Sequence, residues 1–322
     1  MRFVRLSICL AIVAGLSSCS SARKNNGDNG KSTSASSRLN GSKLNGSNPN
    51  DKLKPVVVAS FYPLAFVAER LVGDVATIVN LTPPGVEPHD LEVTPDQAGT
   101  IEDAKLVLTM GQGLQPSVED AAQRRSSGVI ALLDLLEVTD PGNDKRTQET
   151  IDVKSDPHVW LDPQLMQNAV AEIATALAKV FPDSIDDINI RSTELGAELR
   201  GLDAAYVSGL ARCKGKVLVT SHAAFGRLAE RFSLRQEAIV GVSPDAEPTA
   251  DRLATLADLV KINKVTTIFS EELVSPKISE TLAREAGVNV AVLSPIESAP
   301  KQGDYVAAMT KNLAVLRAGL DC

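Results

Sequence analysis

Aromatic residues, histidine and positive charge are all in short supply in this chain. Aromatics make up 3% of the 322 residues, so a core must be built mainly from Ala, Val, Leu and Ile. The formal net charge of −7 argues against nucleic acid as a partner, because phosphate-binding surfaces are basic. With 43% hydrophobic and 23% charged residues, the chain can bury a sizeable core, and its length allows one large domain or two lobes.

The charges are unevenly distributed along the chain. Residues 1–52 hold eight Lys/Arg and two Asp/Glu, so the remainder carries a formal charge of about −13. An acidic body suits cationic ligands better than anionic ones.

The first nineteen residues have the features of an export signal. "MRFVRLSICLAIVAGLSSC" has two arginines, an apolar run and then small residues, and it is too short for a comfortable membrane span. Its end, "LSSC", has the form of a bacterial lipobox, which predicts cleavage before Cys19 and lipidation of the Cys19 thiol. The alternative is an ordinary signal peptide with a coincidental cysteine. We therefore expect an extracytoplasmic lipoprotein, anchored to the outer face of the cell membrane.

Residues 20–52 predict a disordered tether. They are rich in Ser, Asn, Gly and Lys and nearly free of apolar side chains. Such a segment cannot offset the entropy lost on ordering, and as a flexible coil it would reach on the order of 30 Å. Its net charge of +4 would favour an anionic surface.

The four cysteines divide into two pairs. Cys9 leaves with the signal and Cys19 takes the lipid, so Cys213 and Cys322 are the only thiols of the exported body. In an oxidising compartment an even pair is most simply a disulfide. Metal ligation by these cysteines is the weaker alternative, because neither neighbours a histidine.

From residue 55 onward, short β-branched runs alternate with amphipathic stretches. "PVVVAS", "KLVLTM", "GKVLVTSH" and "VTTIFS" are typical of buried strands, and a helical pattern follows each of them. Continuous apolar strands that alternate with helices predict parallel sheets covered on both faces. The predicted fold is α/β, with one lobe over residues 53–181 and a second lobe over residues 214–322.

The stretch between the two lobes has no strand pattern. Residues 162–181 predict one helix that stops at Pro182. Asp183 can cap the next helix, which runs to about Ala211 and forms a linking segment over residues 182–213. Such a helix would be about 40 Å long and could join the lobes. Its apolar residues fall on one stripe: Ile188, Leu195, Leu199, Leu202, Tyr206 and Leu210.

The three histidines are the strongest candidates for a binding site. His222 and His89 are each predicted to follow a strand directly, His89 after the apolar run "TIVNL". Parallel sheets bind ligands outside the carboxyl ends of their strands. His158 precedes a helix and is flanked by Asp156 and Asp162, which can accept the second ring N–H of a ligand histidine. Separations of 69 and 64 residues mean that the fold must bring the histidines together. Three unrelated loop histidines are the alternative.

Five motifs, in order along residues 55–322, carry a resemblance to a known family. They are "GVEPHDLEVTP", "DPHVWLDP", "VTSHAAFGRLA", "FSEELVSPKISETLAREAGV" and "VLSPIES". With them the chain resembles the metal-binding class of ABC-transporter solute-binding lipoproteins, and most closely its zinc-specific members. The resemblance implies two α/β lobes joined by one long helix, with the metal in the cleft between them. It also implies that the protein receives the ion outside the membrane, passes it to a permease and is not an enzyme.

The resemblance also implies a ligand set. It assigns three metal ligands in this chain: His89, His158 and His222. The fourth position in zinc members is a carboxylate in a late loop, here Glu297 in "SPIES". Some relatives carry an aspartate in that motif where this chain has Ser294. Glu271, at the end of "VTTIFS", is the alternative fourth ligand, and a water molecule is a third candidate.

Residues around these motifs have more ordinary interpretations. Many zinc members carry a His-rich loop before the second ligand, but the corresponding stretch here, "TDPGNDKRTQETIDVKSD", has no histidine, so accessory metal capture is not expected. Trp160 is interpreted as a packing anchor for the loop of His158. Glu87 and Asp90 are interpreted as residues that orient the loop of His89 or add to the local field.

The ligand set favours zinc among the divalent metals. Three imidazoles and one carboxylate suit tetrahedral Zn²⁺, whereas manganese members of the class replace one histidine with a carboxylate. The sequence therefore predicts a monomeric zinc-binding protein that feeds an ABC importer. The alternatives are a manganese or other divalent-metal member of the same class, a zinc hydrolase with an activated water, and a surface adhesin with structural zinc.

Overall fold

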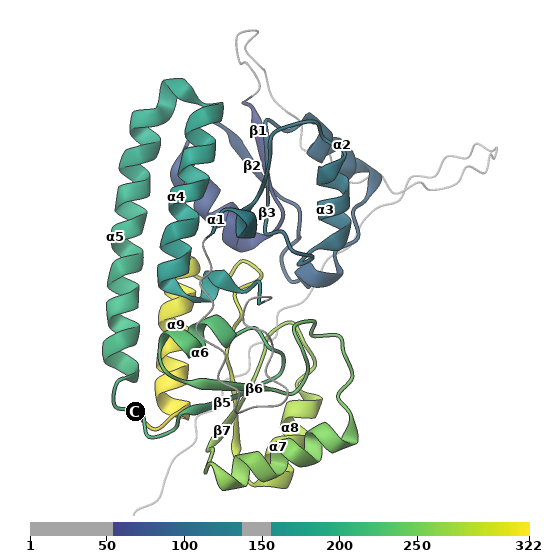
Figure 1. The fold of residues 1–322 in the computed structure, drawn as a ribbon, viewed down its shortest axis with the longest axis vertical. Helices are drawn as coiled ribbons and strands as arrows, with labels where there is room; N and C mark the ends of the chain where they lie inside the picture. The colour runs from purple at the N-terminus through teal and green to yellow at the C-terminus, as the bar shows by residue number, and fades with distance from the viewer. Residues whose placement is uncertain (1–53, 137–155) are drawn as a thin grey trace, which may run out of the picture. The chain divides into compact units, whose positions relative to one another are not determined.

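Two four-stranded parallel sheets, one in each half of the chain, organise the structure (Figure 1). The computed structural model describes residues 54–136 and 156–322, which belong to one unit, Lys52–Cys322. The predicted signal peptide with Cys19, the tether and the stretch 137–155 lie outside the described residues. The α/β fold with two parallel sheets, predicted from the alternation of strands and helices, is confirmed.

The N-terminal lobe is built on a sheet with the strand order β2-β1-β3-β4. Alternate residues of β1, one of its two central strands, point to opposite faces of the sheet. Val57 packs in a core shared with α1, and Val58 packs in a second core with residues of α2 and α3, so both faces are covered. The elements of this lobe are β1 (Val56–Ala59), α1 (Tyr62–Val72), β2 (Thr77–Asn80), η1 (Pro88–Asp90), α2 (Pro95–Asp103), β3 (Leu106–Thr109), α3 (Pro116–Gln123), β4 (Val129–Ala131), η2 (Leu132–Asp134), η4 (Val159–Leu161) and α4 (Pro163–Val180), where η marks a short 3₁₀ helix.

The C-terminal lobe repeats this arrangement on a sheet with the order β6-β5-β7-β8. All four residues of β5 and of β7 are buried, as expected for central strands covered on both faces. Val219 packs with residues of α7 and α8, whereas Leu218 joins the core that reaches the first lobe. The elements of this lobe are β5 (Val217–Thr220), α6 (Gly226–Arg231), β6 (Arg235–Ala238), α7 (Ala250–Ile262), β7 (Thr267–Ser270), α8 (Lys277–Ala286), β8 (Asn289–Val292) and α9 (Tyr305–Gly319).

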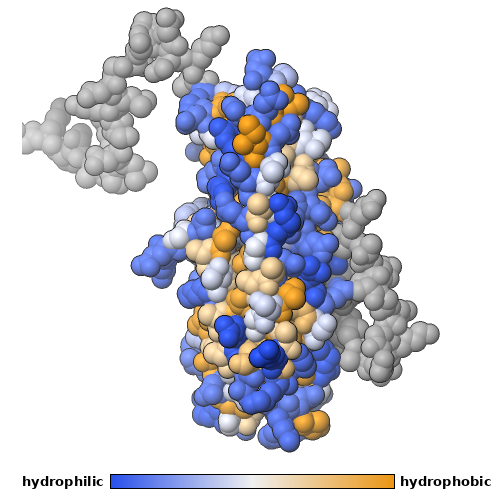
Figure 2. All heavy atoms as spheres, turned by 90° about the vertical axis from the view of Figure 1, so that its left-hand side faces the viewer, coloured by the Kyte–Doolittle hydropathy of each residue, from blue (hydrophilic) through white to orange (hydrophobic). Residues whose placement is uncertain are grey.

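One long helix, α5 (Ile185–Leu210), joins the two lobes. It has 26 residues and is about 39 Å long at 1.5 Å per residue. It packs against α1 and α4 of the first lobe and against α9 of the second (Figure 1). All six residues of the predicted apolar stripe are buried, which confirms the helical pattern. The opposite face is turned to solvent and is a mixture of hydrophilic and smaller hydrophobic areas (Figure 2).

The start of α5 differs from the prediction. Asp183 was expected to cap this helix, and that expectation is wrong, because the capping position is Ser184, without a side-chain hydrogen bond. Pro182 begins a short 3₁₀ helix, η5 (Pro182–Ser184), and Asp183 therefore lies inside that turn. The fixed φ of proline starts the turn before the α-helical register is established.

The largest hydrophobic core runs through both lobes. Its biggest fully buried side chains include Phe61 and Trp160 from the first lobe, Tyr206 from α5, and Phe225 and Tyr305 from the second. Although aromatic residues are few in the chain, this shared core holds several of them. A common core of this kind couples the two lobes more firmly than a polar interface would.

The two cysteines of the body are bonded to each other. The Cys213–Cys322 disulfide closes a separation of 109 residues and fastens the C-terminus to the segment just after α5. Backbone hydrogen bonds support the same junction, from Lys214 N to the Asp321 carbonyl and from Gly215 N to the Leu320 carbonyl. Among the helices that the structure describes, none combines the length and the apolar character needed to cross a bilayer.

Candidate metal centre

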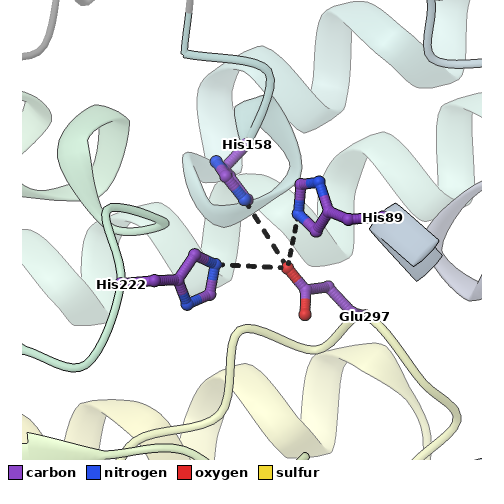
Figure 3. A group of neighbouring side chains, drawn as sticks. All are labelled: His89, His158, His222 and Glu297. Carbon is purple, nitrogen blue, oxygen red and sulfur yellow. Dashed lines mark ion pairs between the residues drawn. The ribbon is translucent and has the colours of Figure 1, made fainter. Parts of the chain in front are cut away.

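Three histidines and one glutamate converge where the lobes meet (Figure 3). One potential ligand atom from each of His89, His158, His222 and Glu297 lies within 4.8 Å of the other three. His158, His222 and Glu297 are fully buried, and the His89 side chain is only 8% exposed. Two of the four side chains belong to each lobe, so the group exists only when both lobes are in place.

His89 comes from a loop of the first lobe and lies in η1. Pro88 begins this turn, and the Glu87 carboxylate accepts a hydrogen bond from the His89 backbone N–H at 3.4 Å. The sequence predicted that His89 directly follows a strand, and this prediction is wrong. β2 ends at Asn80, and the loop between Asn80 and His89 contains Pro83 and Pro84, which cannot donate a hydrogen bond to a sheet. Asp90, next to it, shares a hydrogen bond with Asp245 of the second lobe that raises the pKa of Asp90.

His158 is oriented by the carboxylate of Asp156. The Asp156 Oδ1 atom lies 2.7 Å from the His158 Nδ1 and also accepts the His158 backbone N–H at 3.0 Å. This pairing leaves Nε2 as the nitrogen that points to the centre of the site. Asp162, unlike Asp156, caps α4: its Oδ1 accepts a hydrogen bond from the Gln164 backbone N–H at 2.7 Å.

His222 lies two residues beyond the end of β5, close to the position that the sequence predicted, and Glu271, just after β7, supports it. The Glu271 carboxylate accepts the His222 backbone N–H at 3.0 Å and forms a short contact with Nδ1. It therefore lies on the side of the imidazole ring away from the other histidines and outside the group of four. Thr220, the last residue of β5, donates its hydroxyl to the His222 carbonyl at 2.7 Å.

Glu297 reaches the three imidazoles from the loop between β8 and α9. Its Oε1 lies 3.6 Å from His89 Nε2, 3.5 Å from His158 Nε2 and 3.6 Å from His222 Nε2 (Figure 3). The residue before it, Ile296, is buried with φ of +56°, a conformation that β-branched residues rarely adopt. A backbone held in that region at a binding site carries strain that the surrounding structure must sustain.

Hydrogen bonds from Asn312 fix this loop. The buried Asn312 side chain on α9 accepts the Ser294 N–H at 3.1 Å and donates to the Ser294 carbonyl at 2.6 Å. The Ser294 hydroxyl in turn accepts the Ile296 N–H at 3.2 Å. Ser294, where some relatives have aspartate, therefore shapes the loop here. Asn312 was not predicted from the sequence; its only signal is an amide side chain among the mostly apolar residues of the buried face of α9.

Further hydrogen bonds fasten the two lobes on either side of the site. Trp160 Nε1 donates to the Pro295 carbonyl at 2.7 Å, and the Tyr305 hydroxyl forms a short hydrogen bond to the Trp160 carbonyl. The interpretation of Trp160 as a packing anchor is confirmed, since its ring is 1% exposed. The Gly85 N–H donates to the Ser298 hydroxyl at 2.8 Å, which ties the loop of His89 to that of Glu297.

Five atoms at the centre of the site have unmet hydrogen-bonding capacity. Nε2 of each histidine and both oxygens of Glu297 are buried and make no hydrogen bond among the described residues. Burying such atoms without a partner costs about 1–3 kcal/mol each, and more when they are charged. One of these atoms from each of the four side chains lies within 4.8 Å of the other three, which is the arrangement expected around a bound cation.

The electrostatics of the four groups are strongly linked. Burial alone lowers the pKa of His222, but the Glu271 and Glu297 carboxylates outweigh burial and raise it to about 10. Burial also lowers the pKa of His158, but its hydrogen bonds to Asp156 and Glu297 outweigh burial and raise the pKa overall. Burial raises the pKa of Glu297, but the three histidines reverse this and hold it well below its usual range. Burial and the neighbouring Glu297 raise the pKa of Glu87 to about 8.

The sequence family is established over most of the chain. A family described as "Zinc-uptake complex component A periplasmic" matches residues 57–319. "Zinc-binding protein AdcA" of Streptococcus pyogenes serotype M18 is 34% identical over 290 residues, which cover 83% of this chain and 56% of that protein. "High-affinity zinc uptake system protein ZnuA" of Bacillus subtilis is 33% identical over 283 residues, covering 84% of this chain and 88% of that protein. The chain thus spans about half the length of AdcA.

Solved structures show the same fold. The Zn(II)-bound ZnuA-like domain of Streptococcus pneumoniae AdcA matches with a TM-score of 0.68 and 33% identity, over 84% of this chain and all of that one. The laminin-binding protein Lmb of Streptococcus agalactiae, described as a bifunctional protein with adhesin and metal-transporting activity, matches with a TM-score of 0.74 and 30% identity, over 83% and 99%. The chain therefore belongs to the family of periplasmic component A proteins of zinc-uptake complexes.

Proposed function

We propose that this protein captures Zn²⁺ outside the cytoplasm and delivers it to an ABC permease for import. The observation that carries the proposal is the group of five buried, unpartnered ligand atoms contributed by His89, His158, His222 and Glu297. The names of the relatives, the zinc-binding and zinc-uptake proteins AdcA and ZnuA, support zinc as the cargo.

The donor set is the chemical basis of the proposed selectivity. Three neutral imidazole nitrogens and one carboxylate oxygen form a compact set of intermediate softness, which suits tetrahedral Zn²⁺. Mn²⁺ binds such nitrogen-rich sites more weakly and prefers more oxygen ligands. We propose Glu297 as the fourth ligand, and Glu271 as the residue that orients His222 through Nδ1.

The site is better suited to capture than to hydrolysis. A zinc hydrolase needs an open coordination position where a water is activated. Here four protein groups surround the central point, three of them fully buried, and the two lobes close over it. Manganese transport by the same architecture is the nearest alternative, and the metal preference distinguishes the two.

A competition titration with a chromogenic chelator tests the proposal. Wild-type protein stripped of metal should bind one Zn²⁺ and should prefer zinc over Mn²⁺ by several orders of magnitude. The matched variant His222→Glu, which introduces a second carboxylate, should narrow that preference mainly by weakening zinc. Equal affinities for the two metals in the wild type would refute zinc as the cargo.

The anchoring of the protein is a further part of the proposal. The "LSSC" sequence and the name of the zinc-binding lipoprotein AdcA of Streptococcus pneumoniae support a lipid on Cys19. In cells labelled with a fatty acid, Cys19→Ser should abolish the label and release part of the protein into the medium. Equal labelling of both forms would exclude the anchor.

Adhesion is a second candidate function. It is favoured by the likeness to Lmb, whose description combines adhesin and metal-transporting activity. Surface-immobilised laminin should retain the folded protein. If adhesion is independent of the metal, the variant His158→Ala should bind laminin with the same affinity as the wild type. No retention above that of an unrelated acidic protein would remove this candidate.

A further inference from the structure

The carboxylate that orients His158 rests against the opposite lobe. Asp156 is 2% exposed, and its Oδ1 accepts both hydrogen bonds from His158. Its other oxygen, Oδ2, faces the first residue of α6, Gly226. A Cβ atom placed on Gly226 would lie 2.6 Å from Asp156 Oδ2 and 3.6 Å from Asp156 Cγ. The carboxylate therefore occupies space that every residue except glycine would fill.

Backbone conformation does not demand glycine at this position. Gly85 and Gly111 have positive φ angles, a conformation that favours glycine, but Gly226 does not. Alanine is also the better helix former. The only feature that requires glycine here is the close approach of Asp156.

The neighbouring residue holds the same loop. Arg227 is 3% exposed and donates from Nε to the Asp156 backbone carbonyl at 3.2 Å. The first turn of α6 thus contacts both the carboxylate and the backbone of Asp156. Because α6 belongs to the second lobe and Asp156 to the first, the orientation of His158 depends on the second lobe.

We propose that Gly226 is a positioning residue for the metal ligand His158, because it admits the Asp156 carboxylate against α6. This inference rests on the proposed zinc function of the site. Its consequence is that relative displacement of the lobes disturbs His158 in two ways. It separates the ligand from His222 and Glu297, and it also withdraws the support of the carboxylate that orients its ring.

The test compares zinc affinities of Gly226→Ala and a matched control, Gly201→Ala. Gly201 lies in α5 and is exposed, and a Cβ atom placed on it would meet nothing within 4 Å, so its replacement should leave affinity unchanged. Gly226→Ala should weaken zinc binding about 10- to 100-fold, the usual cost of disturbing the partner of a ligand histidine. The visible absorption of the Co²⁺-loaded protein should also change in Gly226→Ala and not in the control.

A double-mutant cycle with Asp156→Ala separates positioning from general damage. Once the Asp156 side chain is gone, adding Gly226→Ala should change zinc affinity less than about twofold, because contacting pairs are not additive. If Gly226→Ala alone does not fold, the double variant should fold, since the clash has been removed.

Three results would overturn the inference. They are wild-type affinity in Gly226→Ala, an undiminished loss when it is added to Asp156→Ala, and failure of the double variant to fold when Gly226→Ala also fails. Absence of zinc binding in the wild type would instead refute the proposed function, so the two failures are distinguishable.

Discussion

Each histidine at the centre presents Nε2 inward, and two of the three are held by a carboxylate at Nδ1. Asp156 and Glu271 occupy these positions behind His158 and His222. Such pairs fix the ring orientation and make the imidazole a stronger ligand. No equivalent carboxylate contact is found at Nδ1 of His89 among the described residues, and His89 is also the most exposed of the three. His89 is therefore the least supported of the three imidazoles.

Replacement of each ligand histidine tests whether the four groups act as one site. Zinc at a free concentration 1,000 times its Kd should stabilise the folded wild type by about 4 kcal/mol, because it binds the folded form preferentially. His89→Ala, His158→Ala and His222→Ala should each lose most of this gain. Thermal unfolding with and without zinc measures this stabilisation. If all three variants keep the wild-type zinc-induced shift in unfolding temperature, a shared site is excluded.

Zinc binding should release protons. The pKa of His222 is raised to about 10, so this ring holds a proton at pH 7 before the metal arrives, and the pKa of His158 is raised as well. Zinc takes only the neutral rings, so the apparent affinity should increase as pH rises, by about tenfold per pH unit for each proton released. Calorimetry in buffers of different ionisation enthalpy counts these protons. A binding constant that is flat between pH 6 and 8 would contradict the linkage.

The chemistry of the candidate site could be anticipated from particular residues, but its geometry could not. Histidine is so rare here that three copies inside distinctive motifs pointed to one site. The family resemblance favoured Glu297 over Glu271 as the fourth ligand, but the strand pattern alone did not separate them, because both lie near strand ends in sequence. Only the packing of β7 beside β5 puts Glu271 at Nδ1 of His222, and only the turn at Ile296 aims Glu297 at the centre.

At the scale of elements, the site depends on loops that helices hold in place. α9 supplies Asn312 to the loop of Glu297 and Tyr305 to the loop of Trp160, while α6 supports Asp156. The positions of the strands and helices were predictable from the spacing of apolar residues along the sequence. The path from β2 to His89 was not, because a loop with two prolines has no periodic pattern to extrapolate.

The two faces of α5 should respond differently to truncation. Leu199 is fully buried in the core shared by the lobes, and Leu199→Ala should lower the free energy of unfolding by about 2–5 kcal/mol through the cavity it creates. Val207 lies on the same helix with 53% of its surface exposed, and Val207→Ala should change the free energy by less than about 0.5 kcal/mol. Urea denaturation monitored by circular dichroism compares them. Similar losses in both variants would mean that the stripe does not carry the interlobe packing.

At the scale of the whole molecule, the long helix and the shared core favour small adjustments at the site over wide opening. α5 packs against helices of both lobes, and the main core is continuous between them. A hinge would have to break this core, with its Trp160 and Tyr305 contacts. Release of the ion is therefore expected to need a partner that disturbs local contacts near the site.

Reduction of the disulfide should destabilise the protein without removing its metal site. Closing a separation of 109 residues restricts the unfolded chain, for which the chain-entropy model gives about 4–5 kcal/mol. The variant Cys213→Ser/Cys322→Ser should therefore unfold at lower denaturant concentration and still bind zinc, since Cys213 precedes the amino end of β5 whereas His222 lies beyond its carboxyl end. Loss of zinc binding in a folded variant would show that the cross-link shapes the site.

The same cross-link changes what a single backbone cleavage does to the second lobe. Residues 241–249 are mostly exposed and lie outside helices and strands, where a protease would cut. Any such cut falls between Cys213 and Cys322, so both fragments remain covalently joined. A nicked molecule would migrate close to the intact chain on a gel run without reductant and would separate into two bands only when a thiol is added. A single cut in this lobe would therefore release neither half of the molecule.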